Sequence, residues 1–195
     1  MSLRLSTKAL ALAGLVTCLG GVAANRFWIP SRISIGSDLN VLALYKPTPI
    51  PVIHRALAMA KVGPEDTVYD LGSGDGRVLE SAARMFKARA VGIEINYALV
   101  RESRATLRRL GVESQVEVRW GDIFQQDLSP ATVVFIFLPE DANRTLRPKL
   151  ERELRPQTRI ISYGSQIPGW SAVAQQEMSN PDRQGDRQTL YLYRR

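Results

Sequence analysis

The most informative run of this 195-residue chain is Thr67-Val-Tyr-Asp-Leu-Gly-Ser-Gly-Asp-Gly-Arg77. Val68 and Leu71 belong to a short apolar stretch that predicts a buried strand. Three glycines follow at alternate positions, and they allow the backbone to turn tightly and to approach a ligand closely. We expect a helix to begin at about Gly76, with the free N–H groups of its first turn facing the ligand. This order of strand, glycine turn and helix is typical of a site for a nucleotide-like cofactor.

Two carboxylates flank the glycine turn, and they narrow the choice of cofactor. Asp70 precedes the first glycine and Asp75 precedes the last. Acids at these positions would repel a pyrophosphate, whereas they suit a cofactor that carries a positive amino or sulfonium group. The sequence therefore predicts S-adenosylmethionine as the cofactor.

Two further acids follow two further predicted strands. Glu94 ends the strand 90–94, at about the distance at which a Rossmann-type fold places an acid on a ribose. The strand 116–120 leads to Asp122, where a carboxylate and the amide of Ile123 would meet an adenine edge. Alternatively, Glu94 and Asp122 cap the helices that follow. Acids at the ends of three successive strands favour the cofactor interpretation.

The rest of the chain alternates between helical and strand patterns, which predicts an α/β fold with a mostly parallel, Rossmann-like sheet and helices on both faces. The continuous apolar run 132–138 predicts a central strand, and the residues from 172 to 193 predict a C-terminal antiparallel hairpin. Further patterns predict helices over residues 52–61, 76–87, 96–110 and 141–154, and a strand over residues 159–163.

Composition excludes several classes of site. Cys18 and His54 are the only residues of their types, so a disulfide framework, a metal cluster and a Ser-His-Asp triad are not expected. The net charge of +7 comes from residues spread along the chain. Glu and Arg alternate over residues 148–155, which predicts an exposed helix face. Since aromatic residues do not interleave with the basic ones, nucleic acid is not the expected partner.

The N-terminal residues predict a membrane segment. Residues 9–24 are uncharged and rich in Ala, Leu, Gly and Val, and Phe27-Trp-Ile29 would extend them toward the membrane interface. In one interpretation the segment is a signal peptide cleaved after Ala24. In the other it stays as a single-pass anchor with the domain on the cytoplasmic side. The predicted cofactor favours the anchor, because S-adenosylmethionine is made in the cytoplasm.

Three segments follow from this interpretation: a membrane segment over residues 1–29, a linker over 30–44 and a cofactor-binding domain over 45–195. The domain opens with Tyr45-Lys-Pro-Thr-Pro-Ile-Pro51, in which the prolines keep the backbone extended until a helix begins. Such a segment acts either as a lid over the cofactor or as a plain tether.

The motifs 70–77 and 91–96 together resemble those of class I S-adenosylmethionine methyltransferases. The chain from Tyr45 onward is similar to the small protein-lysine methyltransferases, which include a broad-specificity archaeal enzyme and the mitochondrial enzymes acting on the ATP synthase c-subunit and the adenine nucleotide translocase. Further matches to this family lie at residues 46–49, 121–124, 131–134, 146–154, 159–162, 169–170 and 190–193. The resemblance implies a seven-stranded sheet and a protein substrate with an accessible lysine. We further expect a membrane-associated substrate and a monomeric enzyme.

The resemblance implies cofactor contacts at the motif positions and places Thr48 and Pro49 near the methionine end of the cofactor. The predicted cofactor-binding residues are Thr48, Pro49, Asp70, Gly72, Ser73, Gly74, Asp75, Gly76, Glu94, Asn96, Asp122 and Ile123. We expect the acceptor at the carboxyl end of the fourth strand, beside the glycine turn. The candidates there are Phe137, Leu138, Pro139, Tyr163 and Trp170, and no catalytic base is assigned.

Other functions stay open at this point. A methyltransferase for a small molecule, a lipid-like quinone or nucleic acid would use the same cofactor site, and a non-catalytic module could share the fold. The run Leu138-Pro-Glu140 departs from the archaeal pattern, so a different acceptor pocket is expected. Since no Asn-Pro-Pro-Tyr sequence follows the fourth predicted strand, methylation of a base amino group is disfavoured.

Overall fold

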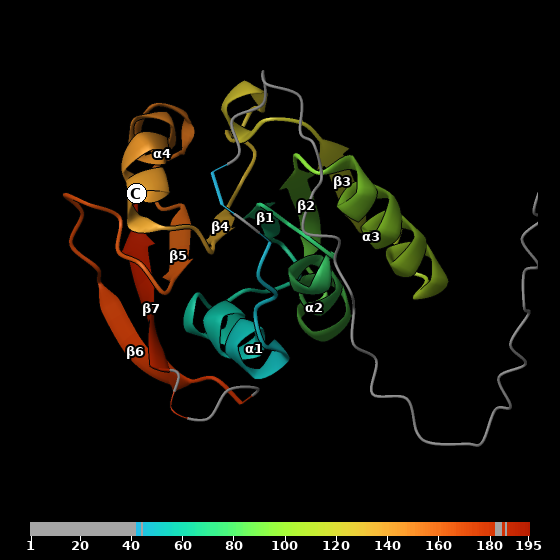
Figure 1. The fold of residues 1–195 in the computed structure, drawn as a ribbon, viewed down its shortest axis with the longest axis horizontal. Helices are drawn as coiled ribbons and strands as arrows, with labels where there is room; N and C mark the ends of the chain where they lie inside the picture. The colour runs from blue at the N-terminus through green and yellow to red at the C-terminus, as the bar shows by residue number, and fades with distance from the viewer. Residues whose placement is uncertain (1–41, 44, 182–184, 186) are drawn as a thin grey trace, which may run out of the picture. The chain divides into compact units, whose positions relative to one another are not determined.

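The computed structural model describes residues 42–43, 45–181, 185 and 187–195, and the predicted membrane segment lies outside them. The described residues form a seven-stranded sheet, as predicted (Figure 1). Its strands are β1 (Thr67–Leu71), β2 (Arg89–Glu94), β3 (Val116–Trp120), β4 (Val133–Ile136), β5 (Arg159–Tyr163), β6 (Ala174–Ser179) and β7 (Arg187–Arg194).

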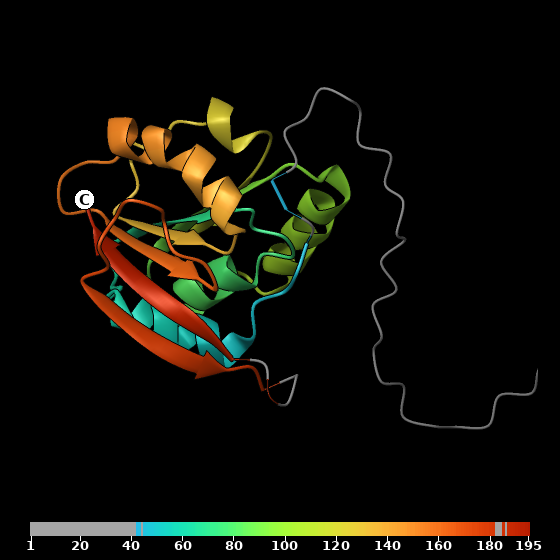
Figure 2. The ribbon, with the colours of Figure 1, turned by 60° about the vertical axis from the view of Figure 1, so that its left-hand side comes forward.

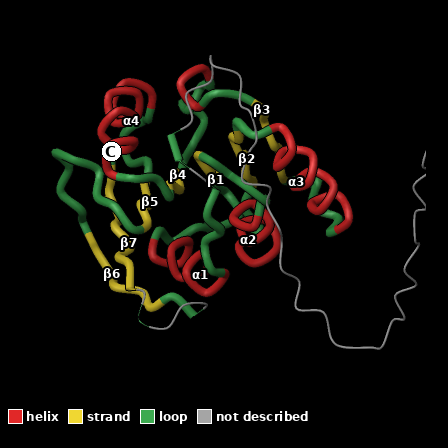
Figure 3. The backbone as a smooth tube through the Cα atoms, in the orientation of Figure 1, coloured by secondary structure: helices red, strands yellow, loops and turns green. Residues whose placement is uncertain are grey.

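The strand order β3-β2-β1-β4-β5-β7-β6 confirms the Rossmann-like arrangement. Strands β1 to β5 pair in parallel, and β7 runs antiparallel to both β5 and β6. The predicted C-terminal hairpin is therefore confirmed, and Figure 3 shows β6 and β7 side by side at one edge of the sheet. The strand order reverses between β1 and β4, and ligands of such sheets bind at this point.

Helices cover both faces of the sheet, because each has one apolar side to bury. Helices α1, α2 and α3 share one core cluster, while α4 and the short 3₁₀ helix η1 belong to a second cluster on the opposite face (Figure 2). The helices are α1 (Ile50–Met59), α2 (Arg77–Phe86), α3 (Tyr97–Arg109), η1 (Ile123–Gln125) and α4 (Glu140–Glu153). In the part of the chain that the structure describes, no helix has the length and apolarity to cross a membrane.

Helix α1 and strand β4 differ most from the predicted boundaries. Helix α1 begins at Ile50 and includes Pro51 in its first turn, where a missing N–H leaves no hydrogen bond unmade. Strand β4 ends at Ile136, although the apolar run continues to Leu138. Residues 137–139 leave the strand because Pro139 cannot donate to a ladder and instead forms the N-cap of α4.

The amino ends of three strands are joined by Asp66. Its carboxylate accepts hydrogen bonds from the amide of Gly63 at 2.9 Å and from the Thr132 hydroxyl at 2.7 Å, and it forms an ion pair with Arg159. Burial raises the pKa of Asp66, but these hydrogen bonds outweigh it and the pKa lies below its ordinary value. The network connects the starts of β1, β4 and β5, at the end of the sheet opposite the glycine turn.

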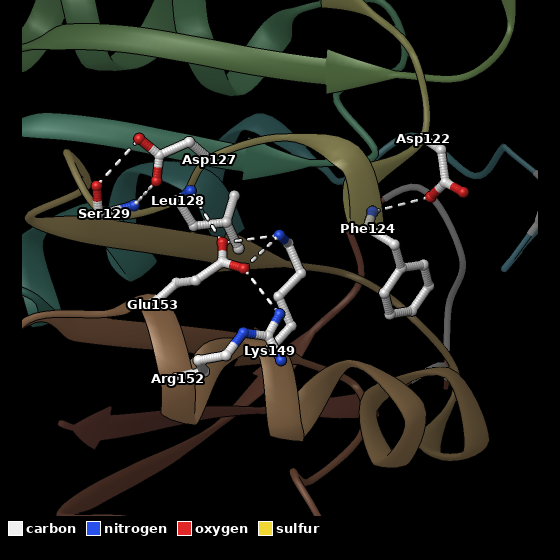
Figure 4. A network of polar contacts seen from close by, with 8 residues as sticks. All are labelled: Asp122, Phe124, Asp127, Leu128, Ser129, Lys149, Arg152 and Glu153. Carbon is white, nitrogen blue, oxygen red and sulfur yellow. Dashed lines mark hydrogen bonds and ion pairs between the residues drawn. The ribbon is translucent and has the colours of Figure 1, made fainter.

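The prediction of an exposed helix face over residues 148–155 is wrong at Lys149. Only 5% of its side chain is exposed, and its ammonium contacts both carboxylate oxygens of Glu153 at 2.8 and 2.7 Å (Figure 4). Glu153 also accepts hydrogen bonds from the Arg152 side chain at 2.9 Å and the Leu128 amide at 3.3 Å. The alternation of Glu and Arg gives no sign of this buried pair, which joins α4 to the loop before β4.

Candidate active site

The glycine turn directly follows β1, and its three glycines have the left-handed backbone that their sequence spacing predicts. The φ angles are +97° at Gly72, +53° at Gly74 and +85° at Gly76, which is the N-cap of α2. The turn rests on β2, since the amides of Gly72 and Ser73 donate to the carbonyl of Ile93 at 2.9 and 3.0 Å. This geometry leaves the turn tightly bound to the neighbouring strand.

Gly92 makes the close approach of the turn to β2 feasible. A Cβ at this position would lie 2.6 Å from both Cβ and Oγ of Ser73. Gly92 lies opposite Asp70 in the β1–β2 register, so it is buried beneath the turn. In the sequence, Gly92 is an isolated glycine within an apolar strand. Such a glycine often marks the close approach of another segment, so this contact was predictable in principle.

Glu94 holds the turn from the end of β2. One carboxylate oxygen accepts the amide N–H of Gly74 at 2.8 Å, and the other accepts the amide N–H of Asn96 at 2.8 Å. The side chain of Asn96 caps α3 by accepting from the Ala98 amide at 3.0 Å. The helix cap is therefore Asn96, and Glu94 connects two loops that both border the predicted cofactor position.

Asp122 follows β3 and caps the next helix with one oxygen. That oxygen accepts the amide N–H of Phe124 at 2.9 Å, as Figure 4 shows. The capping alternative thus applies to Asp122. Ile123 is buried in the core on the α4 face. Nearby, the indole of Trp120 donates to the carbonyl of Ile95 at 3.0 Å, beside Glu94.

The carboxylates around the turn differ in their electrostatic states. Burial raises the pKa of Asp70 well above its ordinary range, and the charges of Glu94 and Asp75 raise it further. Burial also raises the pKa of Glu94, and its backbone hydrogen bonds offset only part of this effect. Asp75 is paired with Arg77 at 2.7 Å; burial raises its pKa, but the Arg77 contacts outweigh burial and lower it. A cationic ligand group would favour the charged form of Asp70, so the site suits a cation.

The proline-rich segment before α1 lies against the glycine turn. The ring of Tyr45 covers Gly74 so closely that a Cβ on this glycine would overlap it, and the Tyr45 hydroxyl hydrogen-bonds to Asp75. Thr48 and Pro49 are buried, and the carbonyl of Thr48 accepts from Arg77 at 3.0 Å. These two contacts favour the lid over the plain tether. No pattern in the sequence singles out Tyr45.

The structure brings four of the five acceptor candidates to the end of β4. Phe137 and Tyr163 pack ring on ring, with centroids 4.7 Å apart. Leu138 lies 4.0 Å from the position of a Cβ on Gly72, so the residues after β4 reach the glycine turn. Pro139 is exposed at the start of α4.

Trp170 lies apart from the other acceptor candidates. Its indole N–H donates to Glu151 of α4 at 2.9 Å, and its ring packs edge-on against Tyr193 at 5.8 Å. It packs against the core cluster of the α4 face, whereas Phe137 and Tyr163 belong to the cluster on the α1 face.

Comparison with known proteins agrees with this geometry. The ANTKMT methyltransferase domain family matches residues 70–174. The chain is 43% identical over 150 residues to a protein-lysine N-methyltransferase of Saccharolobus islandicus, across 76% of this chain and 91% of the relative. It is 34% identical over 119 residues to an ATP synthase c-subunit lysine N-methyltransferase of Caenorhabditis elegans, across 60% of this chain and 62% of that relative. The chain thus spans about six-tenths of the length of the nematode protein.

A solved structure is similar over much of the chain. The RNA methyltransferase from Salinibacter ruber, in complex with S-adenosyl-L-homocysteine, is 40% identical to this chain and superposes with a TM-score of 0.70. The match spans 76% of this chain and 93% of the Salinibacter chain.

Proposed function

This chain belongs to the ANTKMT methyltransferase family, and from that premise we infer how its site works and on what it acts. It is an S-adenosylmethionine-dependent protein-lysine N-methyltransferase. The cofactor predicted from the acids around the glycine turn is thereby confirmed.

The cofactor assignment of individual residues rests on the bond between Glu94 and the amide of Gly74. This bond holds the acid at the edge of the turn, where its other lone pairs can accept the ribose hydroxyls. Asp70 suits the amino group of the methionine part, because a cation relieves the burial of its charge. Asp122 and Ile123 border the adenine position at the end of β3. When bound, S-adenosylmethionine supplies a methyl group on a positively charged sulfur.

The protein's own contribution is to position the two reactants and exclude water. Tyr45 covers the glycine turn, and the buried Thr48 and Pro49 continue the cover toward α1. The acceptor lysine must arrive neutral. Apolar surroundings at Phe137 and Tyr163 lower the pKa of an incoming ammonium and so favour the neutral amine.

Replacement of Glu94 by alanine is expected to weaken S-adenosylmethionine binding about 10- to 150-fold. This corresponds to the roughly 1.5–3 kcal/mol of a hydrogen bond to a charged group. The loss includes the support that Glu94 gives to the Gly74 amide. Calorimetric titration measures the effect. Glu117→Ala is the matched control, because this acid forms an exposed ion pair with Arg119 on the neighbouring strand β3. Equal affinities of Glu94→Ala and the wild type would refute the assignment.

Membrane proteins are the substrates that we propose for this enzyme. The uncharged stretch 9–24 and the adjacent Phe27-Trp28 pair support a retained anchor, with the domain on the cytoplasmic side where the methyl donor is made. An anchor raises the effective concentration of substrates in the same membrane without adding contacts at the active site. Residues 45–195 form the catalytic part in this proposal.

A truncated form that begins at Ser37 tests the proposal. We expect it to methylate free substrate protein as the full chain does, and to lose most of its activity on substrates in intact membranes. Radiolabelled methyl transfer followed by mass spectrometry identifies the methylated residue. Equal turnover of membrane substrates by both forms, or a mature N-terminus at Asn25 in cells, would exclude the retained anchor.

RNA is the second candidate substrate, because the Salinibacter relative is described as an RNA methyltransferase. The residues after β4 read Phe137-Leu-Pro139, and not the Asn-Pro-Pro-Tyr that suits methylation of a base amino group. The same labelling experiment separates the candidates: label in RNA that survives protease treatment would establish the RNA activity, and label on lysine the protein activity.

A further inference from the structure

Within the described part of the chain, three buried side-chain oxygens have no hydrogen-bond partner: Ser73 Oγ, Asn143 Oδ1 and Gln188 Oε1. Ser73 packs over Gly92 beneath the glycine turn. The side-chain amide of Asn143 joins two elements of the fold, because its nitrogen donates to the Ser162 hydroxyl of β5 at 3.2 Å. Gln188 differs from both, since it lies beside the aromatic acceptor candidates. Its orphan oxygen therefore points to a ligand that supplies a donor.

Gln188 reaches the acceptor candidates from the antiparallel strand β7. It lies two residues before Leu190, which belongs to the core on the α1 face. Gly164 follows β5 with a φ of +84°, and a Cβ at this position would lie 3.0 Å from Gln188 Oε1 and 3.3 Å from Cε2 of Phe137. The amide oxygen and the edge of the Phe137 ring therefore both lie beside Gly164, where only a glycine fits without strain.

The Phe137 ring already receives an ammonium group in this structure. Nζ of Lys46 lies over the ring, 5.5 Å from its centroid. Tyr163 packs against the same ring, and Leu138, the next residue, reaches Gly72 of the glycine turn. The cluster of Phe137, Tyr163 and Gln188 thus places a ring face that accommodates the end of a lysine side chain beside the glycine turn.

We propose that the amide oxygen of Gln188 binds the amine of the target lysine, an inference that rests on the lysine methylation described above. The target side chain takes the place over Phe137 that the Lys46 ammonium holds here. One N–H of the neutral amine donates to Gln188 Oε1, and this bond fixes the direction of the nitrogen lone pair. The nitrogen forms a bond to the methyl carbon as the carbon–sulfur bond breaks. Sulfur keeps the electron pair, and the methylated ammonium then gives a proton to water.

If Gln188 binds the amine, its contribution to the rate must differ between the first, second and third methyl transfers. A neutral lysine amine has two N–H groups, a neutral monomethyl-lysine has one, and a neutral dimethyl-lysine has none. The bond to Gln188 is therefore available in the first and second transfers and absent from the third. A residue that only supported the fold would affect all three transfers alike.

Three peptides that carry lysine, monomethyl-lysine or dimethyl-lysine at one position test this difference. For Gln188→Leu we expect kcat/KM to fall about 10- to 100-fold on the first two peptides, the range for a lost hydrogen bond to a charged or reacting group. On the dimethyl-lysine peptide we expect less than about a twofold change. The thermal shift with S-adenosyl-L-homocysteine should equal that of the wild type, which shows an intact fold and cofactor site.

Two further variants complete the experiment. Gln175→Leu is the matched control, because Gln175 is exposed on the neighbouring strand β6. Gln188→Glu keeps an acceptor oxygen and should restore the first two transfers, with the rising limb of kcat moved to higher pH because a carboxylate raises the pKa of the bound substrate ammonium.

The possible failures are distinguishable. Equal losses of Gln188→Leu on all three peptides, or no loss on any of them, would overturn the role of Gln188 alone. If the wild type methylates no lysine peptide but does methylate another class of substrate, the lysine activity and this inference fall together.

Discussion

Replacement of Gly74 by valine should abolish cofactor binding while the domain stays folded. The residue has a φ of +53°, its amide is hydrogen-bonded to Glu94, and a Cβ on it would overlap the Tyr45 ring. A branched side chain would push the ring away and fill the place where the backbone approaches the cofactor. With S-adenosyl-L-homocysteine at about 100 times its Kd, the wild type should gain about 2.7 kcal/mol of stability, or roughly 5–10 °C in Tm. Gly74→Val should gain none.

Gly111→Val is the matched control, because it has backbone strain like that of Gly74→Val without the close contacts. Gly111 also has a positive φ, of +68°, but no atom lies within 4 Å of the position of its Cβ. Both variants carry a strain cost of about 1–2 kcal/mol, and only Gly74→Val meets the ring and the cofactor position. A normal ligand-induced shift in Gly74→Val would remove the close-approach argument.

Replacement of Lys149 by alanine is expected to have the largest effect on stability. The change leaves the Glu153 carboxylate without the ammonium that contacts both its oxygens, and this carboxylate is only 19% exposed. Breaking a buried ion pair costs about 3–5 kcal/mol, and partial hydration of Glu153 reduces this to about 2–4 kcal/mol. Urea unfolding at pH 7 measures the loss as a lower midpoint at constant slope.

Arg144→Ala on the same helix is the matched control. Arg144 also pairs with an acid four residues away, Glu140, but both side chains are well exposed, so a loss below about 0.5 kcal/mol is expected. An equal loss in both variants would contradict the burial argument.

The Lys149 effect should depend on pH. Burial raises the pKa of Glu153, but the bonds from Lys149 and Arg152 outweigh it, and the pKa lies below the ordinary value of 4.5. A lowered pKa adds stability that is complete above the ordinary value and is lost as the pH falls through the lowered one. The difference between wild type and Lys149→Ala should therefore be constant near neutral pH and narrow below about pH 4.5. A difference that stays constant into acid would exclude Glu153 as its source.

Local patterns were sufficient to predict the fold and the backbone of the glycine turn. The run 67–77 combines strand, turn and helix signals within one loop, so its geometry needs little tertiary information. The placement of Glu94 and Asp122 at one edge of the sheet was predictable, because the carboxyl ends of parallel strands meet there. For Asp122 the sequence left two alternatives, a helix cap and a cofactor contact, and the structure shows the cap.

The remaining features depend on contacts between distant segments. Lys149 looks like one member of an exposed helix pattern until the loop at Leu128 covers it. Tyr45 and Gln188 are separated from the glycine turn and from Phe137 by stretches of chain whose course no local pattern gives. The early end of β4 follows from the start of α4 at Pro139, which decides how Phe137 and Leu138 are divided between the two faces of the sheet.

The residues proposed for the methyl donor and those proposed for the acceptor come from separate parts of the chain. All the acids proposed for the methyl donor lie on β1, β2 and β3 or the loops that follow them, whereas Lys46 and Gln188 approach the acceptor from outside the matched family region 70–174. Substitutions in the hairpin β6–β7 or in the proline-rich segment before α1 can therefore change the choice of protein target while the donor chemistry stays the same.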